Sequence, residues 1–546
     1  MSSVAVSIDP RAVHWGLSKS SSSSLALSVP WRERRAARGN DRQLAEAARR
    51  WLADHGSPAT SIPDALSCLS WAYVQFAPDS PLEDDLRHQL FNSLQNLLPE
   101  FSRLAPSSHP LLFQWLSIEL AWPVQLAVAA DADSPAAHAR AEALGQLLAG
   151  AWSMWFDAEA HPLPEARPYV ALLLASAVRC AQWWRDSGLP GWTDNHAAQL
   201  ESLAQVTLRL SRLDSAPFCS DKWLTGDVRS MIDAALAFCR HAETRSLAAA
   251  VDHGAPPSGK ESVDKPALTD YSEAAGLATM RTDWSRTATR IAAACAGSDT
   301  HLEIDVQSKR LVDGLWQAHV SIDGTRLAAT STWFETAWYS DNDVDYLEWT
   351  IDLELGWTLQ RQVMLCREAK LIYLADAVLG DSSATIDYAA DLPLADGIQA
   401  IGADETHEWK LGAGGRKLAW LLPLAFPEWR SAPLAGGLSF EEGRLRGTLR
   451  QAGRSLYFPL LLATDRKHLS KPLTWRRLTV AESLEIVSRD VAVGYRAQFG
   501  QRHWMFYQAL AFTGNRSLLG QNVAGYFTTA EIKKDGSGHN LVRIDE

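Results

Sequence analysis

The chain has 546 residues, more than one hydrophobic core usually serves, so two or more domains are expected. Its net charge of -12 disfavours a general nucleic-acid-binding protein, and no apolar run reaches the roughly 20 residues that a membrane-spanning helix needs. The six cysteines are scattered, without a CxxC pair or zinc-ligand spacing, which favours buried thiols in a reducing compartment and predicts no metal or other cofactor. The 23 tryptophans serve either as core filler or as flat faces for sugar rings.

Residues 1–40 contain a serine run at 19–24 and a basic cluster from Arg32 to Arg38, which predict a disordered N-terminal arm. The arm lacks a basic start followed by a continuous apolar segment, so no signal peptide is recognisable and a cytoplasmic location is expected.

From residue 41 to 251, apolar residues recur at spacings of three and four, and Pro, Gly, Asp or Ser separate the segments. This pattern predicts helices over 42–56, 62–77, 82–98, 109–130, 136–156, 164–188, 193–213 and 225–251. Segments 111–130 and 169–184 are apolar around most of their circumference, so they should lie buried between neighbouring helices. Short connections favour antiparallel hairpins, and we expect a curved array of helix pairs.

Residues 252–267, DHGAPPSGKESVDKPA, have the composition of a linker. From 268 to 546 the apolar period falls towards two, which predicts strands over 290–295, 300–307, 316–323, 325–333, 345–355, 357–367, 370–380, 416–424, 443–453, 454–464 and 490–500. Because no helices intervene, this domain is expected to be a large antiparallel β-sandwich.

The order of helical array, linker and strands resembles the heparinase II/III-like polysaccharide lyases. Three stretches carry the resemblance: Gly276 to Arg281 followed by Trp284; Arg361 to Val378, which contains Asp376; and 301–314, HLEIDVQSKRLVDG. The resemblance implies an α/α toroid joined to an antiparallel β-sandwich, and export from the cytoplasm. The chain departs from the family at 299–305, because DTHLEID holds one histidine where members often show His-x-His-x-Asp.

The resemblance also implies a reaction, β-elimination on a uronate-containing, acidic polysaccharide. A base removes the proton next to the carboxylate, an acid protonates the departing glycosidic oxygen, and a further group neutralises the carboxylate. The alternative, from another class, is a non-catalytic relative that binds glycan or serves as a scaffold. A glycoside hydrolase on a similar toroid is a weaker option, because no pair of carboxylates is indicated.

The candidate catalytic residues are Asn195 as the neutralising group, Tyr271 as acid or base, and His301 as base; the candidate substrate-binding residues are His196, Arg281 and Trp284. Several of them have a structural alternative, and for His301 it is a hydrogen-bonded surface or core histidine on a strand. Thr193 or Asp194 can cap the helix that follows, with Asn195 and His196 in its first turn. Arg281 can pair with an acidic residue instead of a substrate carboxylate.

The acidic stretch WYSDNDVDY, 338–346, alternates aspartates as a calcium loop does. It lacks the EF-hand glycine and the distal glutamate, so a solvated acidic turn before a strand is the favoured interpretation. The chain also lacks G-x-S-x-G, a P-loop and a dinucleotide fingerprint, which disfavours a serine hydrolase and nucleotide chemistry.

Overall fold

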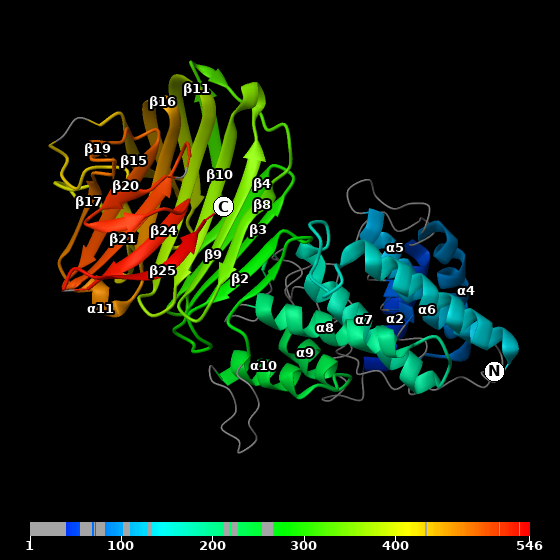
Figure 1. Cartoon of the computed structure of the whole chain (residues 1–546). Helices are drawn as coiled ribbons and strands as arrows, with labels where there is room; N and C mark the ends of the chain where they lie inside the picture. The colour runs from blue at the N-terminus through cyan, green and yellow to red at the C-terminus, as the bar shows by residue number, and fades with distance from the viewer. Residues whose placement is uncertain are drawn as a thin grey trace. The chain divides into compact units, whose positions relative to one another are not determined.

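The computed structural model describes residues 40–54, 68–69, 71–72, 82–101, 110–128, 134–211, 218–219, 228–253, 266–431, 434–512, 514–533 and 535–545. The chain divides into two compact units: a helical unit, with helices up to α10, and a β unit, with strands after Ala267 (Figure 1). The predicted arm, apart from Asn40, and most of the predicted linker lie outside the described residues. Helices and large antiparallel sheets are therefore confirmed, while the toroid and the sandwich remain predictions.

The helical unit contains α2 (Asn40–Asp54), α4 (Asp84–Phe101), α5 (Pro110–Val128), α6 (Pro135–Trp155), the short η2 (Arg167–Tyr169), α7 (Val170–Ser187), α8 (Asp194–Leu210), α9 (Val228–Leu236) and α10 (Ala242–His253). Most of the helix predicted at 62–77 lies outside the described residues. No helix of the described ranges is long and apolar enough to cross a membrane.

The apolar segments α5 and α7 are buried, as predicted, and a charged pair joins them. Glu119 of α5 is 1% exposed, and its carboxylate lies 2.5 Å from Nε of Arg179 on α7. The hydroxyl of Ser176, also on α7, donates to the same carboxylate. Because the buried ions are paired and hydrogen-bonded, two nearly all-apolar helices can meet in one defined register.

The prediction of a single helix at 225–251 is wrong, because the structure has two helices there, α9 and α10, separated by residues 237–241. The carboxylate of Glu201 on α8 accepts the backbone N–H groups of Arg240 and His241 at 3.1 and 2.8 Å. These groups precede the first turn of α10, where backbone donors have no partner within the helix. The buried Glu201, which is distant in sequence, therefore stabilises the start of α10.

The β unit opens with a five-stranded sheet, here called the first sheet, in the order β1-β2-β3-β4-β5. Its strands are β1 (Asp270–Ser272), β2 (Leu277–Arg281), β3 (Thr289–Ala296), β4 (Asp299–Val306) and β5 (Lys309–Leu315). All pairings within it are antiparallel, and each connects strands that follow one another in the chain.

The second sheet, here called the central sheet, has eleven strands. Its main path runs through β12 (Gln399–Gly402), β13 (Trp409–Ala413), β14 (Arg416–Pro423), β16 (Arg444–Ala463), β11 (Leu371–Pro393), β10 (Thr358–Cys366), β9 (Val344–Asp352) and β8 (Phe334–Ser340), while β15 (Gly436–Glu441), β6 (Gln317–Ile322) and β7 (Thr325–Arg326) branch from it. The strand predicted at 325–333 is thus only two residues long, and the strands predicted at 443–453 and 454–464 form one strand, β16.

Two further sheets complete the unit. One has the order β17 (Leu473–Leu478), β20 (Ala492–Phe499), β21 (Arg502–Ala509), β24 (Phe527–Ile532) and β25 (Gly538–Ile544). The smaller has the order β19 (Glu485–Ile486), β18 (Ala481–Glu482), β22 (Arg516–Leu518) and β23 (Gln521–Val523).

Both faces of the central sheet are buried, which explains why its strands read as apolar runs. Alternate residues of β9, such as Leu347 and Trp349, share a core with Ile291 and Leu302 of the first sheet. The residues between them, such as Tyr346, share a second core with strands β20, β21 and β24. Side chains alternate between the faces of a strand, so each core takes every second residue.

Candidate functional site

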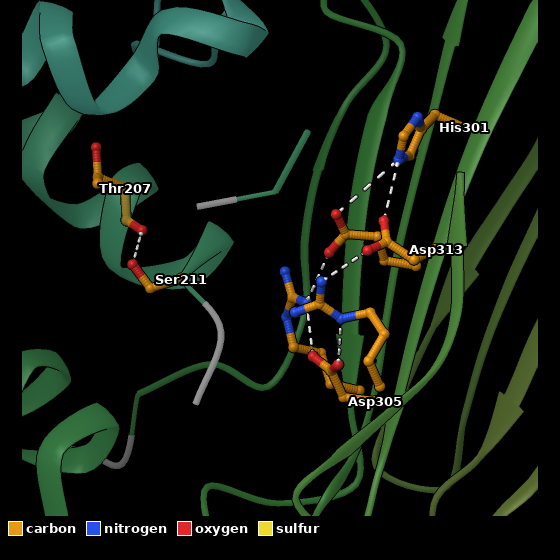
Figure 2. A network of polar contacts seen from close by, with 8 residues as sticks. Thr207, Ser211, His301, Asp305 and Asp313 are labelled. Atoms are coloured by element: carbon orange, nitrogen blue, oxygen red, sulfur yellow. Dashed lines mark hydrogen bonds and ion pairs between the residues drawn. The ribbon is translucent and has the colours of Figure 1, made fainter. Parts of the chain in front are cut away.

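The face of the first sheet turned away from the central sheet carries a network of buried and half-buried charges, here called the charged face. It comprises Arg281, Arg290, His301, Glu303, Asp305, Arg310 and Asp313. Figure 2 labels His301, Asp305 and Asp313 of this set. Nη1 of Arg290 lies 3.1 Å from Asp305 and 3.6 Å from Glu303. The pairing of Arg290 with Asp305 across β3 and β4 brings these side chains together.

Arg310 on β5 closes the network from the other side. Its Nε lies 2.9 Å from Asp305 and its Nη1 lies 3.0 Å from Asp313. Burial acts to raise the pKa of Asp305, but Arg290 and Arg310 outweigh it and lower that pKa. Asp305 is therefore an ionised carboxylate held between two guanidinium groups.

His301 lies at the edge of this network, with Nε2 3.9 Å from one oxygen of Glu303 and 3.9 Å from one oxygen of Asp313 (Figure 2). The side chain of His301 is 26% exposed. Ligand atoms of these three residues lie within 4.8 Å of one another, a geometry that can hold a divalent cation. Arg290 and Arg310 contact the same two carboxylates, so a cation would compete with guanidinium groups.

Arg281 and Trp284 form a local unit at the end of β2. The guanidinium carbon of Arg281 lies 4.5 Å from the centroid of the Trp284 ring. Burial and the nearby Arg290 lower the pKa of Arg281, while Asp305 acts in the opposite direction. A stacked cation of this kind gains about 0.5–2 kcal/mol and holds its side chain in place.

Tyr271 on β1 projects from the opposite face of the first sheet. It is paired with Ala278, which is paired with Ala293 and, one strand further, with Leu302 of the apolar core. Its ring stacks on Trp338 with centroids 4.4 Å apart, and its hydroxyl donates to the carboxylate of Glu335. Burial raises the pKa of Glu335.

Asn195 and His196 lie in the first turn of α8, as predicted. Thr193 is the N-cap, and Nδ1 of His196 accepts the Thr193 backbone N–H at 3.1 Å. Nε2 of the same ring therefore carries the proton and donates to the carbonyl of Gly145 at 3.1 Å. Burial lowers the pKa of His196, and the neutral ring closes a capping box.

At the other end of α8, the hydroxyl of Ser211 donates to the carbonyl of Thr207 at 2.7 Å (Figure 2).

Asn195 is exposed, while both ring nitrogens of His196 are hydrogen-bonded within the helical unit. His196 thus has a packing role, and its predicted contact with substrate remains a prediction.

The structure places Arg281 and His301 on one face of the first sheet and Tyr271 on the other. Sequence reasoning missed Glu335, Arg310 and Asp313. The last two depend on the β4–β5 hairpin, whose turn residues Gln307 and Ser308 both have positive φ, 51° and 67°. Such turns usually carry Asn or Gly, so the sequence held little signal for this register.

The acidic stretch before β9 forms a turn. Asp341 accepts the backbone N–H groups of Asp343 and Val344, which favours the turn over a calcium loop. Asp345 departs from the expected solvated turn, because it is fully buried and its carboxylate lies 2.5 Å from Nη2 of Arg367.

No protein-family model matches the sequence, and no curated protein matches it. Solved structures do match. One is a heparinase III, with a TM-score of 0.63 and 8% sequence identity, and the match covers 89% of this chain and 82% of the heparinase chain. A second heparinase III has a TM-score of 0.60 and 10% identity, over 89% and 83% of the two chains. The heparan sulfate lyase HepC from Pedobacter heparinus has a TM-score of 0.57 and 11% identity, over 91% and 81%.

The chain thus has a polysaccharide lyase fold. At identities of 8–11% this similarity concerns the fold, and function has to be argued from the residues.

Proposed function

We propose that the protein is a polysaccharide lyase that cleaves an acidic, uronate-containing glycan by β-elimination, on an α/α toroid joined to an antiparallel β-sandwich. The fold similarity supports the class, since the similar structures are named as heparinases and heparan sulfate lyase. The resemblance of the three sequence stretches points the same way.

The reaction requires a proton-transfer group beside an anionic sugar. The base must remove a weakly acidic proton, and the acid must protonate the glycosidic oxygen as its bond to carbon breaks. A hydrogen-bonding group on the carboxylate spreads the developing negative charge. Tyrosine serves as acid or base when its surroundings shift its pKa towards the working pH.

The observation that carries the proposal is the pairing of Tyr271 with Glu335. The phenol donates to a carboxylate whose pKa burial has raised, so the two groups exchange a proton at a smaller cost than separated groups would. Trp338, stacked on Tyr271, fixes the ring. In this proposal Tyr271 is the acid or base that transfers a proton in the elimination.

The other predicted roles belong to the same proposal. Asn195 neutralises the substrate carboxylate, and Arg281 binds it. His301 is the second candidate base, and Trp284 and His196 contact the sugar. The cation–π contact of Arg281 with Trp284 supports the substrate-binding role, because it holds a planar guanidinium suited to bidentate carboxylate binding.

A second candidate is a non-catalytic relative that binds glycan or serves as a scaffold. One observation favours it: Tyr271 projects from one face of the first sheet, while Arg281 and His301 project from the other. The single histidine at 299–305 points in the same direction.

The test is incubation with a panel of uronate polymers at several pH values, followed by the ultraviolet absorbance of unsaturated uronate products. The lyase should produce this absorbance, and Tyr271→Phe and Asn195→Ala should each abolish it. Tyr339→Phe is the matched control, since this exposed tyrosine on β8 donates to Asp341 at 2.8 Å and has no proposed role. No absorbance with any polymer would favour the binding protein, and turnover retained in both variants would show that the roles are misassigned.

A further inference from the structure

Two arginines from distant parts of the β unit meet at one neutral group, the side chain of Gln307 in the β4–β5 turn. Its oxygen Oε1 accepts from Nε of Arg466 at 2.9 Å and also from Nη2 of Arg416. Arg466 is the first residue of the short helix α11 (Arg466–Leu469), and Arg416 is the first residue of β14. Two donor nitrogens that share one acceptor oxygen lie within about 6 Å of each other, so two positive charges are held close together here.

The two guanidinium groups have no counter-charge within the residues that the structure describes. Their hydrogen bonds go to the amide of Gln307, and neither group forms an ion pair with a described carboxylate. Asp465 precedes Arg466 in the chain, but its carboxylate accepts the backbone N–H of Lys467 at 3.0 Å. The chain has a net charge of -12, so two arginines without a carboxylate run against its overall composition. Like charges repel, and an anion placed between them would offset this repulsion.

Gln307 is fixed in the orientation that brings the arginines together. The residue is 7% exposed, and its Nε2 donates to the carbonyl of Thr464 at 3.1 Å, which leaves Oε1 to face the arginines. An amide oxygen is a neutral acceptor, so it cannot neutralise two guanidinium groups. Each guanidinium group has several N–H donors, and the bonds to Gln307 use only one from each.

The surface beside Arg416 has room for a ligand. Gly414 and Gly415 precede it with φ of 56° and 79°. A side-chain carbon at either glycine would meet no atom of another part of the chain within 4 Å. Arg416 and Arg466 are both exposed. A small molecule from solution can therefore reach the remaining donors of both side chains.

We propose that Arg416 and Arg466 bind a phosphate dianion, either inorganic phosphate or the phosphate group of a small monoester. The charge argument selects this ligand class. A phosphate monoester carries about −1.5 to −2 charges at pH 7, which matches two guanidinium groups, whereas a uronate or a sulfate ester carries a single charge. Arginine also presents its donors in pairs that fit two phosphate oxygens. The bound phosphate connects the β4–β5 turn, β14 and α11, so it stabilises the folded β unit.

The phosphate site is distinct from the residues proposed for the lyase reaction. Gln307 follows His301 by six positions, which corresponds to about 20 Å along an extended chain. Arg281, which is proposed to bind the substrate, stacks on Trp284, whereas no described aromatic ring lies over Arg416 or Arg466. Sites that hold a ring are usually lined by aromatic side chains, so these arginines suit a compact anion better than a sugar. The phosphate proposal therefore does not depend on the proposed function.

The experiment is calorimetric titration of the full chain with inorganic phosphate, glycerol 3-phosphate, inorganic sulfate and glucuronate. At about pH 7.5 we expect at least one of the two phosphates to bind at least tenfold more tightly than glucuronate, because one additional charge-assisted contact supplies about tenfold. Comparison of the two phosphates shows whether the site takes the free or the esterified ion.

The pH dependence tests the charge argument. The second pKa of a phosphate monoester is about 6, so the affinity for glycerol 3-phosphate should fall about tenfold between about pH 7.5 and about pH 5. Inorganic sulfate is doubly charged at both pH values, and its affinity should change little. An equal loss of affinity for both anions would mean that the protein titrates rather than the ligand, and would refute the argument.

Arg416→Gln and Arg466→Gln should each lose tenfold or more in phosphate affinity. The matched control is Arg489→Gln, an exposed arginine that does not contact Gln307, and it should lose nothing. Gln307→Glu keeps the length of the side chain and places a negative charge between the two arginines, so it should also lose tenfold or more. Urea unfolding of each variant shows that the β unit is still folded.

Three results would overturn the proposal: heat with neither phosphate, equal affinity for glucuronate, or unchanged phosphate affinity in both arginine variants. Unchanged affinity in Gln307→Glu would show that the ligand does not supply a missing charge. Tyr271→Phe should bind phosphate as the natural chain does, so failure of the lyase proposal and failure of this one are separate outcomes.

Discussion

Asp376 offers the sharpest test of how the central sheet is joined to the first sheet. Its buried carboxylate accepts from Nε and Nη2 of Arg361 at 2.8 and 2.7 Å, and from the hydroxyl of Tyr388. Nη1 of Arg361 in turn donates to Thr300 and to the carbonyl of Trp316. Asp376→Asn keeps the shape of the side chain but leaves a guanidinium that is 1% exposed without its counter-charge. Breaking a buried pair in this way costs about 3–5 kcal/mol of the free energy of unfolding.

The matched control is Asp391→Asn, further along the same strand. Its carboxylate also contacts one arginine, Arg446, at 3.3 Å, but the Arg446 side chain is 48% exposed. A pair that water reaches contributes about 0–1 kcal/mol, so the control should lose little. The contrast between the two variants comes from burial, because the residue change and the strand are the same.

Urea unfolding followed by tryptophan fluorescence measures the effect, since Trp316 and Trp333 lie beside Arg361. The double variant Arg361→Met/Asp376→Asn should lose less than the sum of its single variants, by about 0.5–3 kcal/mol, because removal of both charges leaves no unpaired ion. Equal unfolding midpoints for Asp376→Asn and Asp391→Asn, or strict additivity in the double variant, would refute the reasoning.

Three further predictions concern other parts of the chain. Burial raises the pKa of the Glu335 carboxyl group, so the folded state binds the carboxyl proton more tightly than the unfolded state does. The free energy of unfolding should therefore fall as the pH rises through the raised pKa. In urea titrations at several pH values, Glu335→Gln should remove this pH dependence. Glu201→Ala should cost about 1–3 kcal/mol and speed amide hydrogen exchange at 240–241, whereas the exposed Glu243→Ala should not. Burial raises the pKa of Cys366 to about 12, so it should resist a thiol reagent while the half-buried Cys219 reacts, and Cys219→Ser should remove the fast phase.

The two kinds of secondary structure were predictable because burial decides where apolar residues occur along the chain. Helices α5 and α7 are apolar all round since neighbours cover them, and the strands β9, β10 and β11 are apolar runs since both faces of the central sheet are covered. Period alone could not place the ends of elements. β16 continues through Gly453, with φ of 150°, where glycine suggested a turn. The break before α10 depends on Glu201, a residue of another helix.

Connections were less predictable, because their conformation depends on distant side chains. The β4–β5 turn has two residues with positive φ and neither is Gly or Asn. Gln307 in this turn donates from its side chain to the carbonyl of Thr464 at 3.1 Å and accepts from Arg466 at 2.9 Å. Tertiary contacts thus hold a turn that local sequence preferences would not select, and they set the register that brings Arg310 to Asp305.

The separation of Tyr271 from His301 has the same origin. Residues that face each other across an antiparallel pair lie on one side of the sheet, and the chain Tyr271, Ala278, Ala293, Leu302 follows from three successive registers. One residue more in any one of the three turns would shift the later strands by one position and move His301 to the side of Tyr271. A candidate site that combines residues of several strands therefore depends on every turn between them, and motif spacing fixes none of these turns. Arg281 and Trp284 avoid this problem, because their contact lies within one strand end and needs no register.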